Sequence, residues 1–465
     1  MAERAVSAGP GASRRAATED ARAALWMRVL LAGTLLLWAA GLVLGFDRAL
    51  AAVTLIGFVA AIGGLARPAL GLMGIGILCA VDGFSRSILP GSGLYRWNTF
   101  NYWLLLVILI HLPRLLRLRD VHSRLLALFV LVLALGIVIS PLRSEGMETT
   151  LSAATAFGLL VYALRAGRRR GAWLGLALTA GANSAAAGLV FLLQRDRFPS
   201  VNPNVWVFCP LTGIFAIAAG LSAARRPRTQ LVLGLLATID MVWVFLTGSR
   251  GGIALGLLGM AYLLFVMRGV LPRFAAVAAG ILLASFLTAR FAGLDEYSRR
   301  RLDKALDTQE GLRERTSGRS DLVLGAWYMF LDHPLGVGTG GFAPSWAKLG
   351  IRKGMTDYAY GAAKEAHAAW AKTLAENGIL GFGLLFGYVG SFAVSAIRRS
   401  PSRKLALLTS AVLFAAFFST EFAGKGLWLL AGAATAFVDY FPRAAPAEAG
   451  RRVPAGRALP AGAAP

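Results

Sequence analysis

The chain has 465 residues, of which 57% are hydrophobic and 15% are charged, which is less charge than a soluble domain of this size carries. Apolar runs of membrane-spanning length recur with short breaks, which excludes a soluble enzyme on a single anchor and indicates a polytopic membrane protein. The net charge of +24 does not require a nucleic-acid partner, because cytoplasmic loops of membrane proteins collect Lys and Arg.

Hydropathy divides the chain into five parts. Residues 1–23 are polar, basic and rich in Ala and Gly, so we expect a disordered cytoplasmic tail there. We then expect an N-terminal transmembrane bundle over 24–292, a large outer loop with short helices over 293–366, a three-helix membrane segment over 367–441, and a second disordered cytoplasmic tail over 442–465.

The expected fold is an all-α bundle of about 12–14 transmembrane helices. Cys79 and Cys209 fall within apolar runs, which gives no support for a disulfide or a metal site. The apolar runs place the spans near 25–45, 49–66, 68–82, 101–116, 124–141, 149–165, 172–193, 205–224, 230–247, 251–268, 273–292, 376–397, 404–420 and 426–441.

The basic residues indicate how these spans are oriented. If the N-terminal tail lies inside, every strongly basic short loop falls on the same side, including 114–124, 165–170 and 398–404. Short cytoplasmic loops are the ones enriched in Lys and Arg, so this side is predicted to be the cytoplasm. The long loop at 293–366 then lies on the outer face.

Two stretches of the long loop stand out. The segment "DLVLGAWYMFLDHP" (321–334) is predicted to be an amphipathic piece that lies in the membrane interface. The segment "GVGTGG" (336–341) has the glycines of a phosphate-binding loop but lacks the strand, the helix and the Lys-Ser/Thr pair of such a loop. We therefore interpret it as a flexible turn near a binding cleft.

Several arginines gather at the expected outer boundary. Arg250, in "TGSRGG", is wedged between two apolar runs, where a charge is costly without a partner. One interpretation is a side chain that snorkels or pairs with lipid phosphate. The other is an anion site, since the next span begins at once and its N-terminus favours phosphate. Arg195, Arg197 and Arg319 are further candidates on the same face.

His367 opens the first span after the long loop, within "KEAHAAWAKTLAENGILGF" (364–382). It could be a polar residue at the membrane interface, or a general base, a role that His fills near neutral pH with little adjustment. No second His or carboxylate stands at metal-ligand spacing, and His333 is distant in sequence, so we expect no metal. Glu376 and Asn377 are predicted to be packing or groove-lining residues.

Three motifs in this order resemble the O-antigen ligase and polymerase superfamily. They are "TGSRGG" (247–252), "GR…W…DHPLGVGTGGF" (318–342) and "HAAWAKTLAENGILGF" (367–382). The resemblance covers about residues 180–435 and leaves the N-terminal third as generic membrane helix. One departure is Ala368, where family ligases often have a polar residue.

The resemblance implies a GT-C-like membrane glycosyltransferase in the bacterial inner membrane, with its active site facing the periplasm. The implied donor is a glycan on undecaprenyl pyrophosphate, and the implied acceptor is a lipid A–core sugar or a growing glycan. No cofactor or metal is implied. We expect His367 and Arg250 to be catalytic, with Arg195, Arg197 and Arg319 binding the pyrophosphate.

Two alternatives remain open. Within the same family, the protein could be a repeat-unit polymerase for O-antigen, capsule or exopolysaccharide. Outside it, the protein could be a membrane transporter, for which polar residues at mid-membrane and internal repeats are expected. The candidate residues here lie at the outer boundary, which favours the glycosyltransferase.

Overall fold

The protein is an all-α polytopic membrane protein, and every regular element in the described part of its computed structural model is a helix. Among the described residues, four helical stretches are long and apolar enough to cross a membrane: Ala21–Leu44, Phe46–Gly63, Gly171–Phe191 and Pro227–Leu246. The structure describes residues 10–85, 106, 109, 121–166, 170–194, 206–221, 224, 226–247, 249–266, 282, 319–352 and 368–399.

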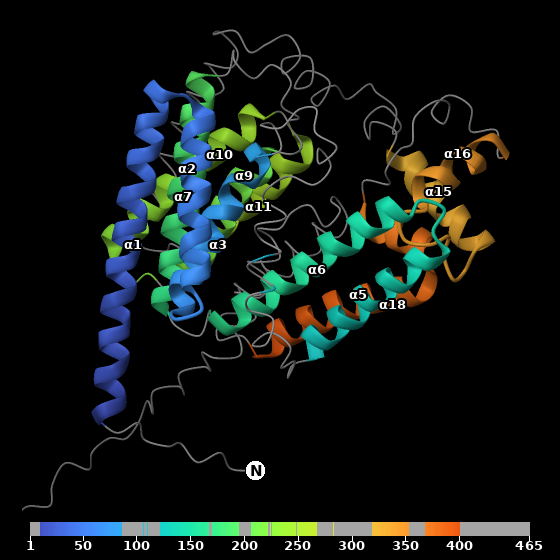
Figure 1. Ribbon diagram of the computed structural model, residues 1–465, viewed down its shortest axis with the longest axis horizontal. Helices are drawn as coiled ribbons and strands as arrows, with labels where there is room; N and C mark the ends of the chain where they lie inside the picture. The colour runs from blue at the N-terminus through green and yellow to red at the C-terminus, as the bar shows by residue number, and fades with distance from the viewer. Residues whose placement is uncertain are drawn as a thin grey trace, which may run out of the picture.

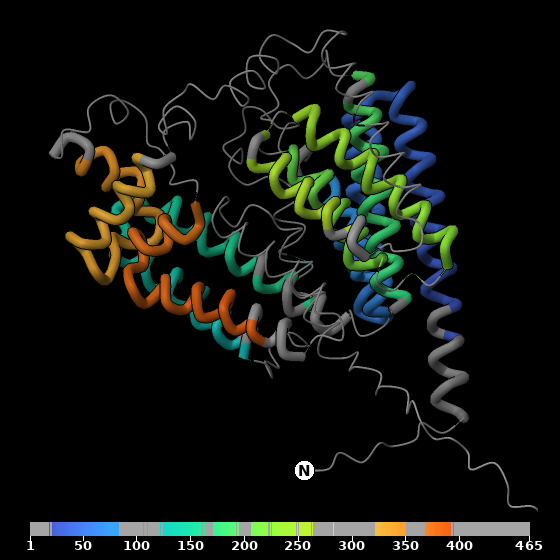
Figure 2. Tube along the Cα trace, turned by 180° about the vertical axis from the view of Figure 1, so that it is seen from behind, coloured from blue at the N-terminus to red at the C-terminus, as the bar shows by residue number. Residues whose placement is uncertain are grey.

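The helices form two groups that lie side by side (Figures 1 and 2). In the first group the central helix α7 packs against α1, α3, α9 and α10, and α11 packs on α9 and α10. Most residues of α9 are buried. The members of this group are α1 (Pro10–Leu44), α2 (Phe46–Gly63), α3 (Pro68–Ser85), α7 (Arg170–Leu193), α9 (Phe208–Leu221), α10 (Pro227–Leu246) and α11 (Arg250–Val266).

In the second group α5 packs against both α18 and α6. The two short helices α15 and α16 sit together at one end of these long helices (Figure 1). Contact with the first group includes α6 against α3. The members are α5 (Val121–Ile139), α6 (Arg143–Ala166), α15 (Arg319–Asp332), α16 (Phe342–Arg352) and α18 (Ala369–Arg399).

Each predicted span that falls within the described residues is a helix, including the closely joined α2 and α3. The predicted spans at 101–116, 273–292, 404–420 and 426–441 lie essentially outside those residues. One boundary differs from expectation: residues 1–23 were expected to form a disordered tail, whereas α1 already begins at Pro10. The Ala-rich stretch ahead of the first span explains this, because Ala has the highest helix propensity.

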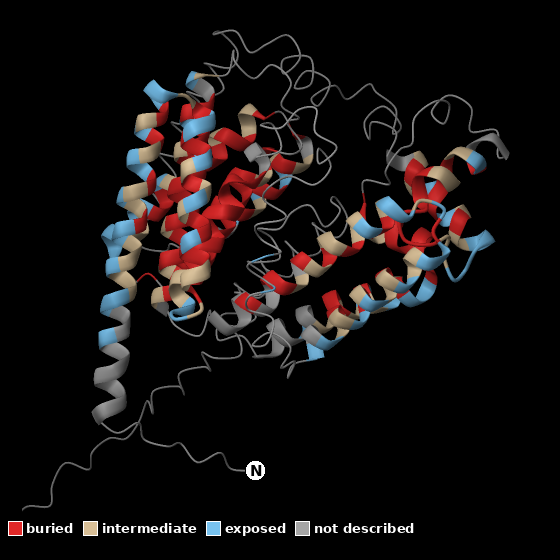
Figure 3. Cartoon of the chain, in the orientation of Figure 1, coloured by how far each residue is buried: buried red, intermediate tan, exposed pale blue. Residues whose placement is uncertain are grey.

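Buried positions gather where the helices face one another and exposed positions lie along their outer sides (Figure 3), and many of the exposed residues are large and apolar, as expected for a membrane protein. Leu36 and Val43 of α1 are exposed, as expected for a helix that faces lipid. Polar links lie in the interior instead. Ser184 Oγ of α7 donates to Asp240 Oδ1 of α10 at 2.7 Å. Trp38 Nε1 of α1 donates to the side-chain Oδ1 of Asn183 in α7 at 3.0 Å. Sequence inspection missed Asp240, whose pairing ties two spans together.

Candidate functional site

Of the five residues predicted to act on substrate, the structure describes two. Arg250 is the first residue of α11 and Arg319 is the first residue of α15. Arg195, Arg197 and His367 lie outside the described residues; His367 precedes the start of α18 at Ala369 by two positions. Both described arginines thus stand at helix N-termini, where anions are stabilised. Convergence of all five on one site stays a prediction.

The turn that carries Arg250 is built by its hydroxyl side chains. The Thr247 hydroxyl donates to Val244 O at 2.7 Å and accepts from the Ser249 amide at 3.2 Å. The Ser249 hydroxyl then accepts from the Gly252 amide at 3.3 Å, which makes Ser249 the N-cap of α11. A Cβ on Gly251 would meet nothing within 4 Å. No described atom therefore crowds the Gly251 side of the first turn of α11.

The "GVGTGG" turn is held by its own backbone rather than being flexible. The amides of Val337 and Gly338 donate to the carbonyls of Ala375 and Glu376 in α18, at 3.0 and 2.8 Å. The amide of Thr339 donates to Gly136 O in α5 at 3.2 Å. Because these amides are already bonded to carbonyls, they do not cradle a phosphate. The turn that was expected to be flexible is thus anchored to α5 and α18 by hydrogen bonds, and we call it the connector turn.

The turn can dock there because α18 is broken at Gly378, where φ is 58° and ψ is −156°. This conformation favours glycine, and it lets the next amide, Ile379 N, donate sideways to Pro334 O at 3.1 Å. Gly336 and Gly338 also have positive φ, 93° in each case. The glycines of the two motifs are therefore used to bring two backbones together.

Thr339 forms the buried centre of this junction. Its hydroxyl lies 2.7 Å from Leu133 O of α5 and 2.8 Å from Asn377 Oδ1 of α18, and its side chain is fully buried. Gly136 of α5 leaves the necessary space, since a Cβ there would meet Thr339 Oγ1 and would lie 2.8 Å from Asn377 Oδ1. We refer to Gly136, Thr339, Glu376 and Asn377 as the junction cluster.

Glu376 connects the junction cluster to helix α16. Its Oε1 accepts from the amide of Phe342, the first residue of α16, at 3.1 Å. A carboxylate at this place satisfies an otherwise unpaired amide and complements the positive end of the helix. Glu376 is buried, which is consistent with its prediction as a packing or groove-lining residue, while its capping of α16 was not foreseen.

Two of the three sequence motifs thus form a single hydrogen-bonded unit at one end of α5 and α18. A family model described as O-antigen ligase matches residues 231–386, which contain all of these motifs. Residues 231–386 of this chain are therefore similar to the O-antigen ligase family. This family supports glycan ligase or polymerase activity in general, on lipid-linked glycans, in a multi-pass membrane protein. A comparison with curated proteins gave no match.

The ligase-family segment is not self-contained in the structure. Its helices α10 and α11 belong to the first group, whereas α15, α16 and α18 belong to the second. The connector turn rests on α5, on the α5–α6 connection, where a Cβ on Gly338 would lie 2.7 Å from the backbone of Ser140, and on the first turn of α6, where a Cβ on Gly340 would meet the backbone of Gly146. Residues 121–166 were interpreted as generic membrane helix, and no motif there indicated that α5 and α6 form the seat of the turn.

Proposed function

We propose that the protein is an O-antigen ligase-like enzyme that transfers a glycan from undecaprenyl pyrophosphate to a lipid A–core sugar. The reaction would take place at the periplasmic face of the bacterial inner membrane, with inversion and without a metal. One observation carries the proposal: the motif that ends in "GVGTGG" and the motif that follows His367 are joined by direct backbone bonds.

That junction supports a role for His367 because of where α18 begins. The helix starts at Ala369, and its first turns pack against α15 and α16 in a common apolar cluster of buried residues, among them Leu322, Trp346 and Ala371. A base has to be held in place to act within hydrogen-bond reach of the proton that it removes. The packed first turns of α18 therefore support the proposal that the residue just before this helix acts as a base.

The proposed reaction is a single displacement. A hydroxyl of the acceptor sugar attacks the anomeric carbon, the new carbon–oxygen bond forms, and the bond from that carbon to the pyrophosphate oxygen breaks. His367 takes the hydroxyl proton, and undecaprenyl pyrophosphate leaves. Arg250, with Arg319 and Arg195 or Arg197, stabilises the negative charge that grows on the leaving group. The positions of Arg250 and Arg319 at helix N-termini support this division of roles.

The test is complementation of a deletion strain with His367→Ala and with Arg250→Ala at matched membrane levels. We expect both variants to lose surface glycan, because one lacks the base and the other lacks charge stabilisation. The chain offers two matched controls. His333 is exposed at the end of α15, and Arg143 is exposed at the start of α6; alanine at either position should leave glycan transfer intact.

Wild-type glycan in both site variants would overturn the proposal. The deletion itself separates the two family activities. Loss of a ligase leaves lipid A–core bare while lipid-linked polymer persists, whereas loss of a polymerase leaves products that carry a single repeat. Single-repeat products would replace the ligase by the polymerase and keep the roles of His367 and Arg250.

A further inference from the structure

Helix α15 is apolar on two opposite faces. One face packs inward through Leu322, Gly325, Ala326 and Met329, which line the cluster shared with α16 and the start of α18. At Gly325 the contact is so close that a Cβ would meet the ring of Trp346. An ordinary surface helix has one apolar face, which packs on the core. The inward face of α15 is that face, so it does not explain the apolar residues on the opposite side.

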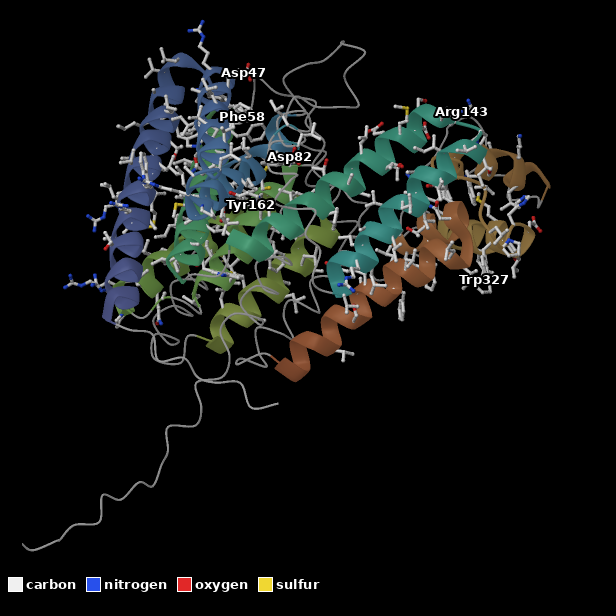
Figure 4. The ribbon with its side chains drawn as sticks, turned by 60° about the horizontal axis from the view of Figure 1, so that its bottom comes forward. Asp47, Phe58, Asp82, Arg143, Tyr162 and Trp327 are labelled. Carbon is white, nitrogen blue, oxygen red and sulfur yellow. The ribbon has the colours of Figure 1, made fainter. Side chains whose placement is uncertain are left out.

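The opposite face of α15 is apolar and uncovered in the structure. Leu324 is 43% exposed, Trp327 is 47% exposed and Leu331 is 55% exposed, and Leu335, just beyond the helix, is 78% exposed. The spacing of the first three places them on one side of the helix. Figure 4 shows Trp327 at the outer edge of the α15/α16 group. The predicted amphipathic pattern is thus wrong: residues 322–331 contain no charged side chain at all.

The neighbouring helix α16 shows what a one-sided surface helix looks like in the same place. Phe342, Trp346 and Leu349 are buried, whereas Lys348 is exposed. Its outer side is compatible with water. The outer side of α15 is not, because a stripe that contains a Trp and three Leu would be costly to leave hydrated.

The exposed stripe continues onto α18, whose residues 376–397 are a span predicted from the sequence. Pro334 O accepts from Ile379 N, which joins the end of α15 to the kink. Ile379 and Leu380, directly after the kink, are 56% and 58% exposed. Further along the same helix Phe386 is also exposed, as expected where a membrane helix faces lipid. The stripe on α15 is therefore an extension of a lipid-facing surface.

We infer that α15 lies on the membrane and that its outer face, formed by Leu324, Trp327, Leu331 and Leu335, is buried in the lipid leaflet on the side of the α5–α6 connection. Residues 322–331 span about 15 Å as a helix, half of the roughly 30 Å of a bilayer core, so α15 cannot cross it. Charged residues flank the apolar stretch at Asp321 and Asp332, which suits a helix at headgroup depth. Trp is typical of that depth.

The test is fluorescence quenching on the full chain in lipid nanodiscs made of phosphatidylethanolamine and phosphatidylglycerol. The two cysteines, both buried, are first replaced by alanine. An environment-sensitive dye is then attached at Trp327→Cys or Leu331→Cys, and each is compared with Phe386→Cys as the lipid-facing control and Lys348→Cys as the water-facing control. Nitroxide-labelled lipid and iodide report contact with lipid and with water.

We expect the dye at positions 327 and 331 to be quenched by nitroxide lipid several-fold more than at 348, and by iodide several-fold less. The same two positions should resemble 386. Iodide quenching equal to that at 348 would overturn the inference, since the face would then be in water. Protection from both quenchers would overturn it as well, because a second copy or another part of the chain would then cover the face.

Discussion

Replacing Gly136 by alanine tests whether the junction cluster depends on close contact between α5 and the connector turn. A Cβ at this position would meet Thr339 Oγ1 and lie 2.8 Å from Asn377 Oδ1 and 3.1 Å from Thr339 N. Overpacking a buried site by one methyl group costs about 1–3 kcal/mol. Parting Thr339 from Asn377 costs about 1 kcal/mol more. Alanine returns roughly 0.5–1 kcal/mol through its helix propensity.

The net cost is therefore about 1–3 kcal/mol. This cost weakens the free energy with which the connector turn packs on α5. Because each 1.4 kcal/mol is a factor of about ten, we expect glycan transfer to fall by about fivefold to a hundredfold at matched expression. The assay is surface glycan measured against membrane protein, together with thermal unfolding of the purified protein in detergent.

A matched control lies in the same pair of helices. A Cβ on Gly383 of α18 would meet nothing within 4 Å, so Gly383→Ala adds the same methyl group to a helix without a clash. It should leave transfer and thermal stability unchanged or slightly improve stability. Equal behaviour of Gly136→Ala and Gly383→Ala would refute the role assigned to the junction cluster.

Two further substitutions probe the helix starts of the site. Glu376→Ala removes the acceptor for the Phe342 amide, so we expect the protein to lose about 1–2 kcal/mol of stability and to be cleaved faster within α16. Glu376→Gln retains an acceptor oxygen and should behave close to wild type. Equal proteolysis of the two variants would contradict the capping role. Ser249→Asn and Ser249→Asp are close in size and both can cap α11, but only Asp places a negative charge beside the neighbouring arginine. Glycan transfer should therefore fall several-fold further for Asp than for Asn, and identical rates would argue against an anion at that helix start.

The helices could be predicted from the sequence because hydropathy is a local property. Long apolar runs gave the positions of α2, α3, α7 and α10, since a span must satisfy its backbone internally and so appears as a continuous stretch. The helical extension of α1 back to Pro10 was missed because low hydropathy was interpreted as disorder, although Ala-rich sequence favours helix.

The junction cluster could not be predicted because its contacts join distant parts of the chain. Thr339 and Leu133 are 206 positions apart, and a single sequence contains no periodic pattern that pairs them. The glycines of "GVGTGG" did indicate unusual backbone, and three of them have positive φ. The sequence did not reveal that the partner of this turn is the backbone of α18 near the Gly378 kink rather than a phosphate.

The exposed face of α15 shows a different limit. The sequence indicated an amphipathic segment near the membrane over residues 321–334, and the charged or polar residues Asp321, Asp332 and His333 of that segment do not form one side of the helix. In the structure these residues sit toward the ends of the helix rather than along one face. End charges and side charges look alike in composition, and only burial of Gly325 and Met329 separates the two faces.

The seat of the connector turn on α5 has a consequence for engineering hybrid enzymes. The segment that identifies the family, residues 231–386, rests on Gly136 and on the α5–α6 connection, which lie outside it. A chimera that exchanges this segment between two such proteins would pack the connector turn of one protein against the α5–α6 surface of the other, where the contacts do not match. The smallest exchangeable unit is therefore expected to include residues 121–166 as well, a helical hairpin that carries no recognisable motif.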